Sequence, residues 1–560
     1  MNTHHSSLPF SGIAPDKADT DISNVTPPSS SAHTPTGNGG KLPTLTPFWR
    51  DRFFEGALIL SMFLYYIVGN PKQPILYFSH IGPLLNQLIA LPFLLIFAAL
   101  CWYRLSIAIA LLPLSLPFYM QQRAIVGTIS FSLAEVTLTI CLTIAFLHLL
   151  LKNRDQLSWP QLRERMGPFF WPILIFCGAA ALSILVAYNR RFAFRTFHEE
   201  VVAPLLYLGL ALSYLRTRQD LLRLLIALLG TGLLVAFIGL GQFAFFWNAM
   251  ASIQGGQRLH ATYGSANSIG LLFDYVLPLA IACLLARVAP KSRLLALGAC
   301  IVMIPVLYLT YSGGAWMAIS VAALFVIALS LRNRRLLLAG SAIFIVLVAG
   351  GLLVFHTRID HFLLSWHAAA QGQGSIVKRF YLWESAWHMI QNSPWLGYGM
   401  DNWLCHYNGV NTACPNNLYH YWITVDPSTG LPTGLTSEPD LSHPHNIFLH
   451  VWVSIGIFGL LAFIAVLVLF FRLFVRILKH LSVANVEGGE QLRWMTVGIG
   501  AGMLATLVQG MIDSAFLEQD LAFCFWMLVT ALLLVRIHSG VSWKRARSIS
   551  QKQIISPSGN

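Results

Sequence analysis

Charged residues are scarce in this sequence. Only 11% of its 560 residues are Asp, Glu, Lys or Arg, whereas soluble domains carry about 25%. Hydrophobic residues make up 56% of the chain, and its mean hydropathy is +0.63. A chain of this length could form several soluble domains. The composition excludes that organisation and indicates a polytopic membrane protein.

The sequence also lacks the continuous basic surface of a nucleic-acid-binding protein. The formal net charge is +13, but the Lys and Arg residues occur in short clusters between apolar runs. No nucleic-acid partner is therefore expected, and the lipid bilayer is the expected environment. Residues 1–46 lack a hydrophobic run and are rich in Ser, Thr, Pro and His, which predicts a disordered tail rather than a signal peptide.

Apolar runs dominate the remainder of the chain. A helix that crosses the ~30 Å hydrocarbon core of a bilayer needs about 20 residues. The predicted fold is therefore all-α, a polytopic bundle of about 12–14 transmembrane helices. The candidate spans lie near residues 53–68, 80–101, 105–119, 128–151, 168–188, 201–215, 221–247, 268–289, 294–311, 313–331, 336–355, 446–471, 494–512 and 519–537.

The distribution of basic residues predicts the orientation, because Lys and Arg accumulate in short cytoplasmic loops. Placing both termini in the cytoplasm puts about three quarters of the 36 Lys and Arg residues inside. The predicted organisation is a cytoplasmic tail, a transmembrane bundle, a large extracytoplasmic loop, C-terminal transmembrane helices and a basic cytoplasmic tail. These segments comprise residues 1–46, 47–355, 356–445, 446–537 and 538–560, respectively.

The external loop begins its polar part with a helical pattern over residues 375–391. Its aromatic residues recur at helical spacing, and Trp383 and Trp387 favour a position at the membrane interface. We therefore expect an interfacial helix on the outer leaflet. Lys378 and Arg379 lie near its beginning.

Several cations lie on the side of the membrane where they are disfavoured. An anionic ligand can retain a cation there, although a lone arginine can instead snorkel or pair with an acid. Arg258, Lys378 and Arg379 lie beside other polar motifs, so we expect them to contact an anion. The arginines at 190, 191 and 195 are second candidates.

Two histidines directly precede the span that begins near residue 446. His443, His445 and Asn446 are costly at a membrane surface unless they have partners. A lone histidine there is more often a satisfied core residue, but this pair lies beside Pro444 at a helix mouth and favours a functional site. Nearby acids could complete a metal site, but the spacing matches no strong zinc signature. No metal and no cofactor is predicted.

Four polar motifs occur in order along the chain. They read RLHATYGSAN (258–267), YSGGAW (311–316), RFYLWESA with PWLGYG (379–386 and 394–399), and HPHN (443–446). Together they resemble the O-antigen ligase/polymerase superfamily of polytopic membrane glycosyltransferases. The resemblance covers roughly residues 200–537, and GMID (510–513) also fits. One departure concerns a cation, because the family often has Ser-Arg-Gly where this chain has Ser312, Gly313 and Gly314.

The resemblance implies a reaction outside the cytoplasm. A glycan would pass from a polyprenyl diphosphate carrier to a glycan, lipid or protein acceptor, on the extracytoplasmic face of the bacterial cytoplasmic (inner) membrane. Arg258 and Arg379 would neutralise the leaving diphosphate, because a guanidinium suits bidentate phosphate contact. Lys378, Asn267 and Asn446 complete the predicted substrate-binding residues.

The resemblance also implies a general base. The acceptor hydroxyl must lose its proton as it attacks the anomeric carbon, and histidine is the usual base near neutral pH. His445 is the predicted base, with His443 as its orienter or as an alternate base. Asp513 in the GMID turn is a candidate for holding the catalytic histidine in one tautomer.

Three functions remain open at this point. A ligase joins a finished glycan to its acceptor, whereas a polymerase of the same superfamily uses another carrier-linked repeat unit as acceptor. The third, from another class, is a lipid-linked oligosaccharide transporter. Transporters commonly show two related halves with broken helices at matching positions. This sequence shows no such duplication, and its polar motifs gather on one side of the membrane.

The eight cysteines divide by predicted location. Six fall in apolar spans and behave as small hydrophobic residues. Cys405 and Cys414 both lie in the external loop, an oxidising location in most bacteria. The sequence leaves two alternatives open: these two residues form a structural disulfide, or both are free thiols.

Overall fold

The computed structural model describes residues 47–70, 77–78, 80, 82–120, 122–126, 129–151, 158–246, 258–331, 338, 342, 375–407 and 443–543. The predicted tail over residues 1–46 and most of the predicted C-terminal tail lie outside these ranges. Almost all of the predicted span at 336–355 and most of the predicted external loop, including Cys414, also lie outside them.

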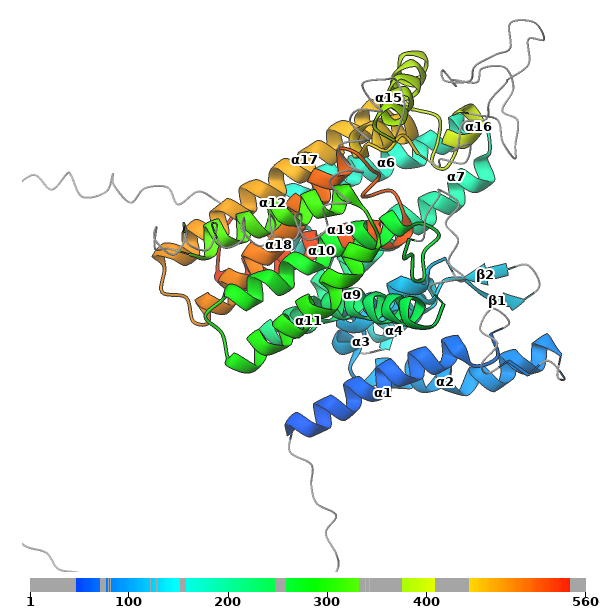
Figure 1. Cartoon of the computed structure of the whole chain (residues 1–560). Coiled ribbons are helices and arrows are strands. Elements are labelled where there is room, and N and C mark those ends of the chain that lie inside the picture. Colours follow the sequence, from blue (N-terminus) through cyan, green and yellow to red (C-terminus); the bar gives the residue numbers. More distant parts are fainter. Residues whose placement is uncertain are drawn as a thin grey trace, which may run out of the picture. The chain divides into compact units, whose positions relative to one another are not determined.

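Nine helices in the described ranges are long and apolar enough to cross a membrane. This finding confirms the predicted class, a polytopic helical bundle (Figure 1). The spans are α2 (Pro83–Tyr103), α4 (Leu133–Leu151), α5 with α6 (Trp159–Met166 and Phe170–Val186), α9 (Arg218–Phe246), α10 (Ala266–Leu285), α11 (Pro290–Leu309), α12 (Gly313–Ser330), α17 (Ile447–Val483) and α19 (Gln519–Ser539).

Four other predicted spans form helices that are shorter or less apolar. The second half of the predicted span at 105–119 is a 3-10 helix that contains Pro113 and Pro117. Proline lacks the backbone N–H that an α-helix needs, which explains why the α-helix does not continue. A π-helical segment replaces the start of another. The number of clear spans among the described residues is therefore below the predicted 12–14. These elements are α1 (Pro47–Ile67), α3 with η2 (Leu105–Leu111 and Leu112–Phe118), η5 with α8 (Phe197–Val202 and Ala203–Tyr214) and α18 (Gly489–Gly510).

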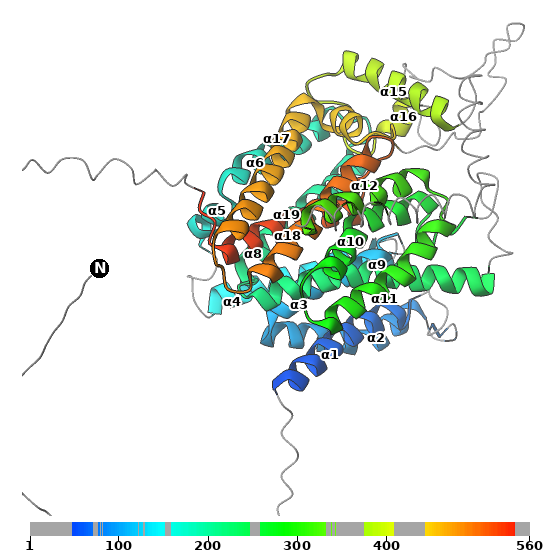
Figure 2. The same ribbon diagram turned by 60° about the vertical axis from the view of Figure 1, so that its left-hand side comes forward.

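The bundle core lies around α10, α18 and α19. Helix α19 is apolar on all sides and buried over nearly its whole length, as expected for a central helix. Helix α18 packs against α10 and α12 (Figure 2). Gly502 allows the close approach of α18 to α10, since a Cβ there would lie 2.9 Å from the carbonyl oxygen of Tyr275.

One small β-hairpin interrupts the helical architecture in the described residues. Strands β1 (Arg123–Val126) and β2 (Ile129–Phe131) pair antiparallel. The Arg123 side chain is 1% exposed and donates hydrogen bonds to the carbonyl oxygens of Tyr65 and Val68 and to the side chain of Gln87. This external arginine therefore has structural partners and needs no ligand.

Helix α17 is broken near its start by the PWLGYG motif. Gly456 has φ +74°, and a Cβ there would lie 1.9 Å from the carbonyl oxygen of Trp395. The N–H groups of Tyr398 and Gly399 donate to the carbonyl oxygens of Val453 and Ser454. The break in α17 leaves backbone carbonyl groups without partners inside the helix, and the PWLGYG motif donates hydrogen bonds to them.

The predicted interfacial helix is α15 (Ser375–Asn392). It packs on the start of α17 and beside α16 (Trp403–Tyr407). Leu382 and Met389 are buried in this contact, whereas Phe380 and Trp387 are exposed. Helix α15 is therefore amphipathic, as the sequence predicts, and its buried face holds it against the loop before α17.

Candidate active site

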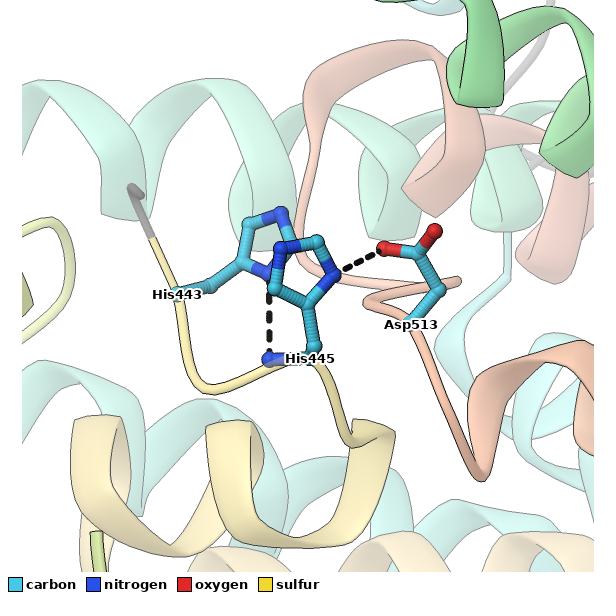
Figure 3. A group of neighbouring side chains, drawn as sticks. All are labelled: His443, His445 and Asp513. Carbon is cyan, nitrogen blue, oxygen red and sulfur yellow. Dashed lines mark hydrogen bonds and ion pairs between the residues drawn. The ribbon is translucent and has the colours of Figure 1, made fainter. Parts of the chain in front are cut away.

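His445 and Asp513 meet between two helix ends. His445 lies just before α17, and Asp513 lies in the turn after α18 (Figure 3). Nδ1 of His445 is 2.8 Å from Oδ1 of Asp513, and the two side chains are only 13% and 6% exposed. The same carboxylate oxygen accepts the N–H of Ser514 at 2.9 Å. The site is thus a buried His–Asp pair.

Charge stabilises the ionised form of Asp513. Burial by itself raises the pKa of this carboxyl, but the neighbouring His445, His443 and Arg379 outweigh burial and lower the pKa to about 2. An ionised carboxylate only accepts hydrogen bonds, so Nδ1 of His445 carries the proton. Nε2 of His445 is then the basic nitrogen.

His443 lies against His445, with ring centroids 4.5 Å apart. Its Nδ1 accepts the backbone N–H of His445 at 3.3 Å, so its proton lies on Nε2, 3.7 Å from a carboxylate oxygen of Glu518. Burial, together with the neighbouring His445 and His450, holds the pKa of His443 well below its usual range. His443 is therefore a neutral neighbour whose ring nitrogen holds the backbone of His445.

The backbone around His445 is held from two sides. Trp383 of α15 donates its indole N–H to the carbonyl oxygen of His445 at 3.3 Å. Asn446 caps α17, since its side-chain oxygen accepts the N–H groups of Phe448 and Leu449, and its amide nitrogen donates to the carbonyl oxygen of Met511. These contacts give the predicted substrate-binding Asn446 a positioning role.

Several motif residues have a left-handed backbone conformation, with positive φ. The non-glycine residues with positive φ in the described ranges are Ala261, Tyr311, Asp401 and His445. Three of them lie within the RLHATYGSAN, YSGGAW and HPHN motifs, and Asp401 follows PWLGYG by two residues. Such strained conformations persist where the surrounding structure requires them, and they cluster at functional sites.

Two arginines are anchored on neighbouring turns. Arg258 donates from Nε to the carbonyl oxygen of Thr310 at 2.8 Å and from Nη2 to the side chain of Asn267 at 2.7 Å. Arg379 donates from Nε to the carbonyl oxygen of Ile512 at 2.8 Å. Asn267 therefore orients Arg258, and Arg379 lies next to the turn that carries Asp513.

The turns that anchor these arginines touch each other. A Cβ on Gly314, in the first turn of α12, would lie 3.0 Å from Cδ1 of Ile512. All four motif groups therefore converge with GMID at one end of the bundle. The Lys378 side chain lies outside the described residues, and Arg195 pairs with Glu199 at 2.8 Å, which explains its retention without a ligand.

Sequence reasoning missed two neighbours of the histidine pair. Glu518, 22% exposed, faces His443; burial, with Asp520 and Asp513 nearby, raises its pKa well above the usual range. His450 lies one turn into α17, and its Nδ1 is 2.5 Å from Oγ of Ser514. The one available signal was the density of acids after GMID, in residues 513–520.

The His443, His445 and Asp513 side chains could also hold a metal ion, since one ligand atom from each lies within 4.8 Å of the others. Ligands on a tetrahedral zinc lie about 3.3 Å apart, because zinc–nitrogen and zinc–oxygen bonds measure ~2.0–2.1 Å. The 2.8 Å separation of His445 and Asp513 matches a hydrogen bond better. Glu438 and Asp440 are the nearby acids of the sequence that could complete a metal site, and both lie outside the described residues.

The cysteines agree with their predicted locations. Cys405 is disulfide-bonded, and its partner lies outside the described residues. The six cysteines of the predicted spans are free thiols. None of these six is a neighbour of the His–Asp pair in sequence, and the described site contains no cysteine.

Comparison with known proteins supports the resemblance to a family. Residues 298–464 match the family model described as O-Antigen ligase. No curated protein matches the chain. The matched range contains YSGGAW, RFYLWESA, PWLGYG and HPHN, so three of the four motif groups that carry the resemblance lie within it. The match supports the resemblance of this chain to the O-antigen ligase-like superfamily, through residues 298–464.

Proposed function

We propose that this chain is a glycosyltransferase that moves a glycan from a polyprenyl diphosphate carrier to an acceptor hydroxyl. The match to the O-antigen ligase family supports a membrane enzyme of the ligase or polymerase type. The arrangement of two arginines and a His–Asp pair at one end of the bundle supports this donor and this chemistry. The lipid bilayer, the lipid-linked donor and the acceptor are the partners.

In this proposal, the end of the bundle that carries Arg258 and His445 faces the extracytoplasmic side. Arg258 and His445 lie at the end where α11 and α18 finish and α12 and α17 begin. The opposite ends of α10, α11, α17 and α18 carry clusters of Lys and Arg, over residues 287–293 and 472–493. Because such clusters favour the cytoplasm, the site faces outward from the bacterial inner membrane.

The His445–Asp513 hydrogen bond carries the proposal. Since Asp513 accepts a hydrogen bond from the N–H at Nδ1, Nε2 of His445 can accept the proton of the acceptor hydroxyl. The acceptor oxygen then attacks the anomeric carbon, and the bond from that carbon to the diphosphate oxygen breaks. Polyprenyl diphosphate leaves with the bonding electron pair. Asp513 stabilises the imidazolium that forms.

Arg258 and Arg379 neutralise the leaving diphosphate. Each guanidinium is held through Nε by a backbone carbonyl, which aims it before the substrate binds. Asn267 fixes Arg258, and Lys378 at the start of α15 is a third proposed cation. This chemistry serves a ligase and a polymerase equally, because the two differ only in whether the acceptor hydroxyl belongs to a glycan, lipid or protein or to a second carrier-linked unit.

The direct test uses purified protein in nanodiscs with a polyprenyl diphosphate-linked glycan and candidate acceptors. We expect a new glycosidic bond and an equal amount of released polyprenyl diphosphate, without any nucleotide sugar and in the presence of EDTA. Loss of transfer in EDTA with recovery on addition of a divalent ion would indicate a metal mechanism instead. Movement of the donor across the bilayer without bond formation would indicate a transporter.

A further inference from the structure

The N-terminus of α12 lies next to the turns that anchor the two arginines. Its N-cap Ser312 follows Thr310, whose carbonyl oxygen binds Arg258. Gly314 in its first turn contacts Ile512, whose carbonyl oxygen binds Arg379. The helix start thus adjoins the two turns that anchor the guanidinium groups.

This helix start has the chemistry of an anion site. The first N–H groups of a helix have no acceptor within the helix, and the helix dipole adds partial positive charge. The first intrahelical bond of α12 runs from the N–H of Trp316 to the carbonyl oxygen of Ser312. Gly313 is exposed, and a Cβ there would meet no atom within 4 Å, so an anion can approach the backbone closely.

A buried amide beneath the helix start provides a second, independent observation. Gln509 of α18 is 1% exposed, and neither its amide nitrogen nor its amide oxygen has a hydrogen-bond partner among the described residues. Its Nε2 lies 3.6 Å, and Oγ of Ser312 3.4 Å, from the position of a Cβ on Gly270. The amide nitrogen therefore lies near the N-cap hydroxyl of α12. A buried donor without a partner is costly, which favours a ligand that accepts from it.

We infer that the N-terminus of α12, together with the Gln509 amide, binds one phosphate of the donor diphosphate. This inference rests on the proposed function and extends it to a residue-level binding element. The backbone N–H groups at Gly313 and Gly314 take the place of the cation that the family often carries in this motif. Arg258 and Arg379 then flank the bound phosphate on either side.

The test compares two substitutions of opposite charge at Gly313. The measured quantity is the affinity of the purified full-length protein for farnesyl diphosphate. Gly313→Glu should weaken binding at least tenfold, because its carboxylate would repel the phosphate. Its thermal midpoint should stay the same or rise, since an acid at a helix N-terminus is favourable. Gly313→Arg should bind at least as tightly as the wild type, and Gly313→Ala should change binding little.

Gly82 supplies a matched control. It is the N-cap of α2, and a Cβ there also meets no atom within 4 Å, but it belongs to none of the motifs. Gly82→Glu should leave farnesyl diphosphate binding unchanged. Gln509→Met should weaken binding severalfold without lowering the thermal midpoint, because it removes a buried unpartnered amide.

The outcomes separate this inference from the proposed function. Wild-type affinity in Gly313→Glu would overturn the inference, and wild-type affinity in Gln509→Met would contradict the contact with the amide. If binding depends on Arg258 but not on Gly313, the inference fails and the proposed donor stands. If the wild-type protein binds no farnesyl diphosphate, both fail.

Discussion

Nδ1 of His445 lies 2.8 Å from Oδ1 of Asp513, although 68 positions separate the two residues in the sequence. The start of α17 fixes one partner and the end of α18 fixes the other. Asn446 links the two segments by its hydrogen bond to the carbonyl oxygen of Met511. The pair is therefore held in place by helix ends, and in the proposed reaction this lowers the reorganisation needed when charge develops on the imidazole.

Asp513→Asn tests the pair. The amide keeps the shape of the side chain but loses the charge that holds the proton on Nδ1 of His445. We expect the transfer rate to fall by roughly 10²-fold or more, the range of a general-base contribution, while farnesyl diphosphate binding persists. Glu518→Gln is the matched control, because Glu518 faces His443 and not His445. Equal rates for Asp513→Asn and the wild type would remove Asp513 from the mechanism.

The arginines give a second prediction. Arg258→Lys and Arg379→Lys should each reduce transfer by roughly 10²-fold, because lysine replaces a bidentate fork with a point charge. Expression and thermal midpoint should change little, and the Michaelis constant for the donor should rise. Arg195→Lys is the control, since Arg195 pairs with Glu199. Normal donor kinetics in both variants would exclude the diphosphate contact.

The pH dependence of stability follows from His443. Its pKa is lowered in the folded protein by burial and by the neighbouring histidines, so the unfolded chain binds a proton that the folded chain does not. Stability should therefore fall as pH drops below about 6.5, the pKa of an unperturbed histidine. Thermal midpoints between pH 8 and 5 should show this decline, and His443→Gln should reduce it. An identical decline in the variant would contradict the assignment.

Gly456→Ala tests how the PWLGYG motif holds α17. The new Cβ would clash with the carbonyl oxygen of Trp395 and force a residue into positive φ. We expect a loss of at least about 2 kcal/mol in unfolding free energy. Gly241→Ala in α9 is the control, because its Cβ meets no atom within 4 Å. Equal stability of the two variants would contradict the described break.

The sequence predicted the local parts of this structure better than the long-range ones. Hydropathy predicted the spanning helices, and HPHN was recognisable because Asn446 has the side chain of an N-cap and follows two costly histidines. The break at Gly456 was not predictable, since a single glycine in an apolar run does not reveal which loop will enter. The contacts of Asn267 with Arg258 and of Asn446 with Met511 were not predictable either, because the tertiary structure sets them.

The acid limb of the rate profile separates the two histidines. Asp513, with its pKa lowered to about 2, stays ionised throughout the range from pH 8 to 5, and His443, with its lowered pKa, stays neutral over most of it. The ionisation of Asp513 and the charge of His443 therefore do not account for a loss of transfer on acidification in this range. The deciding measurement is the transfer rate of purified wild-type protein and His445→Ala across this range, at saturating donor. We predict that the wild-type rate falls on acidification, and that His445→Ala is slower by roughly 10²-fold or more, independent of pH, with normal farnesyl diphosphate binding. A folded His445→Ala protein that transfers glycan at the wild-type rate would contradict the assignment of His445 as the base.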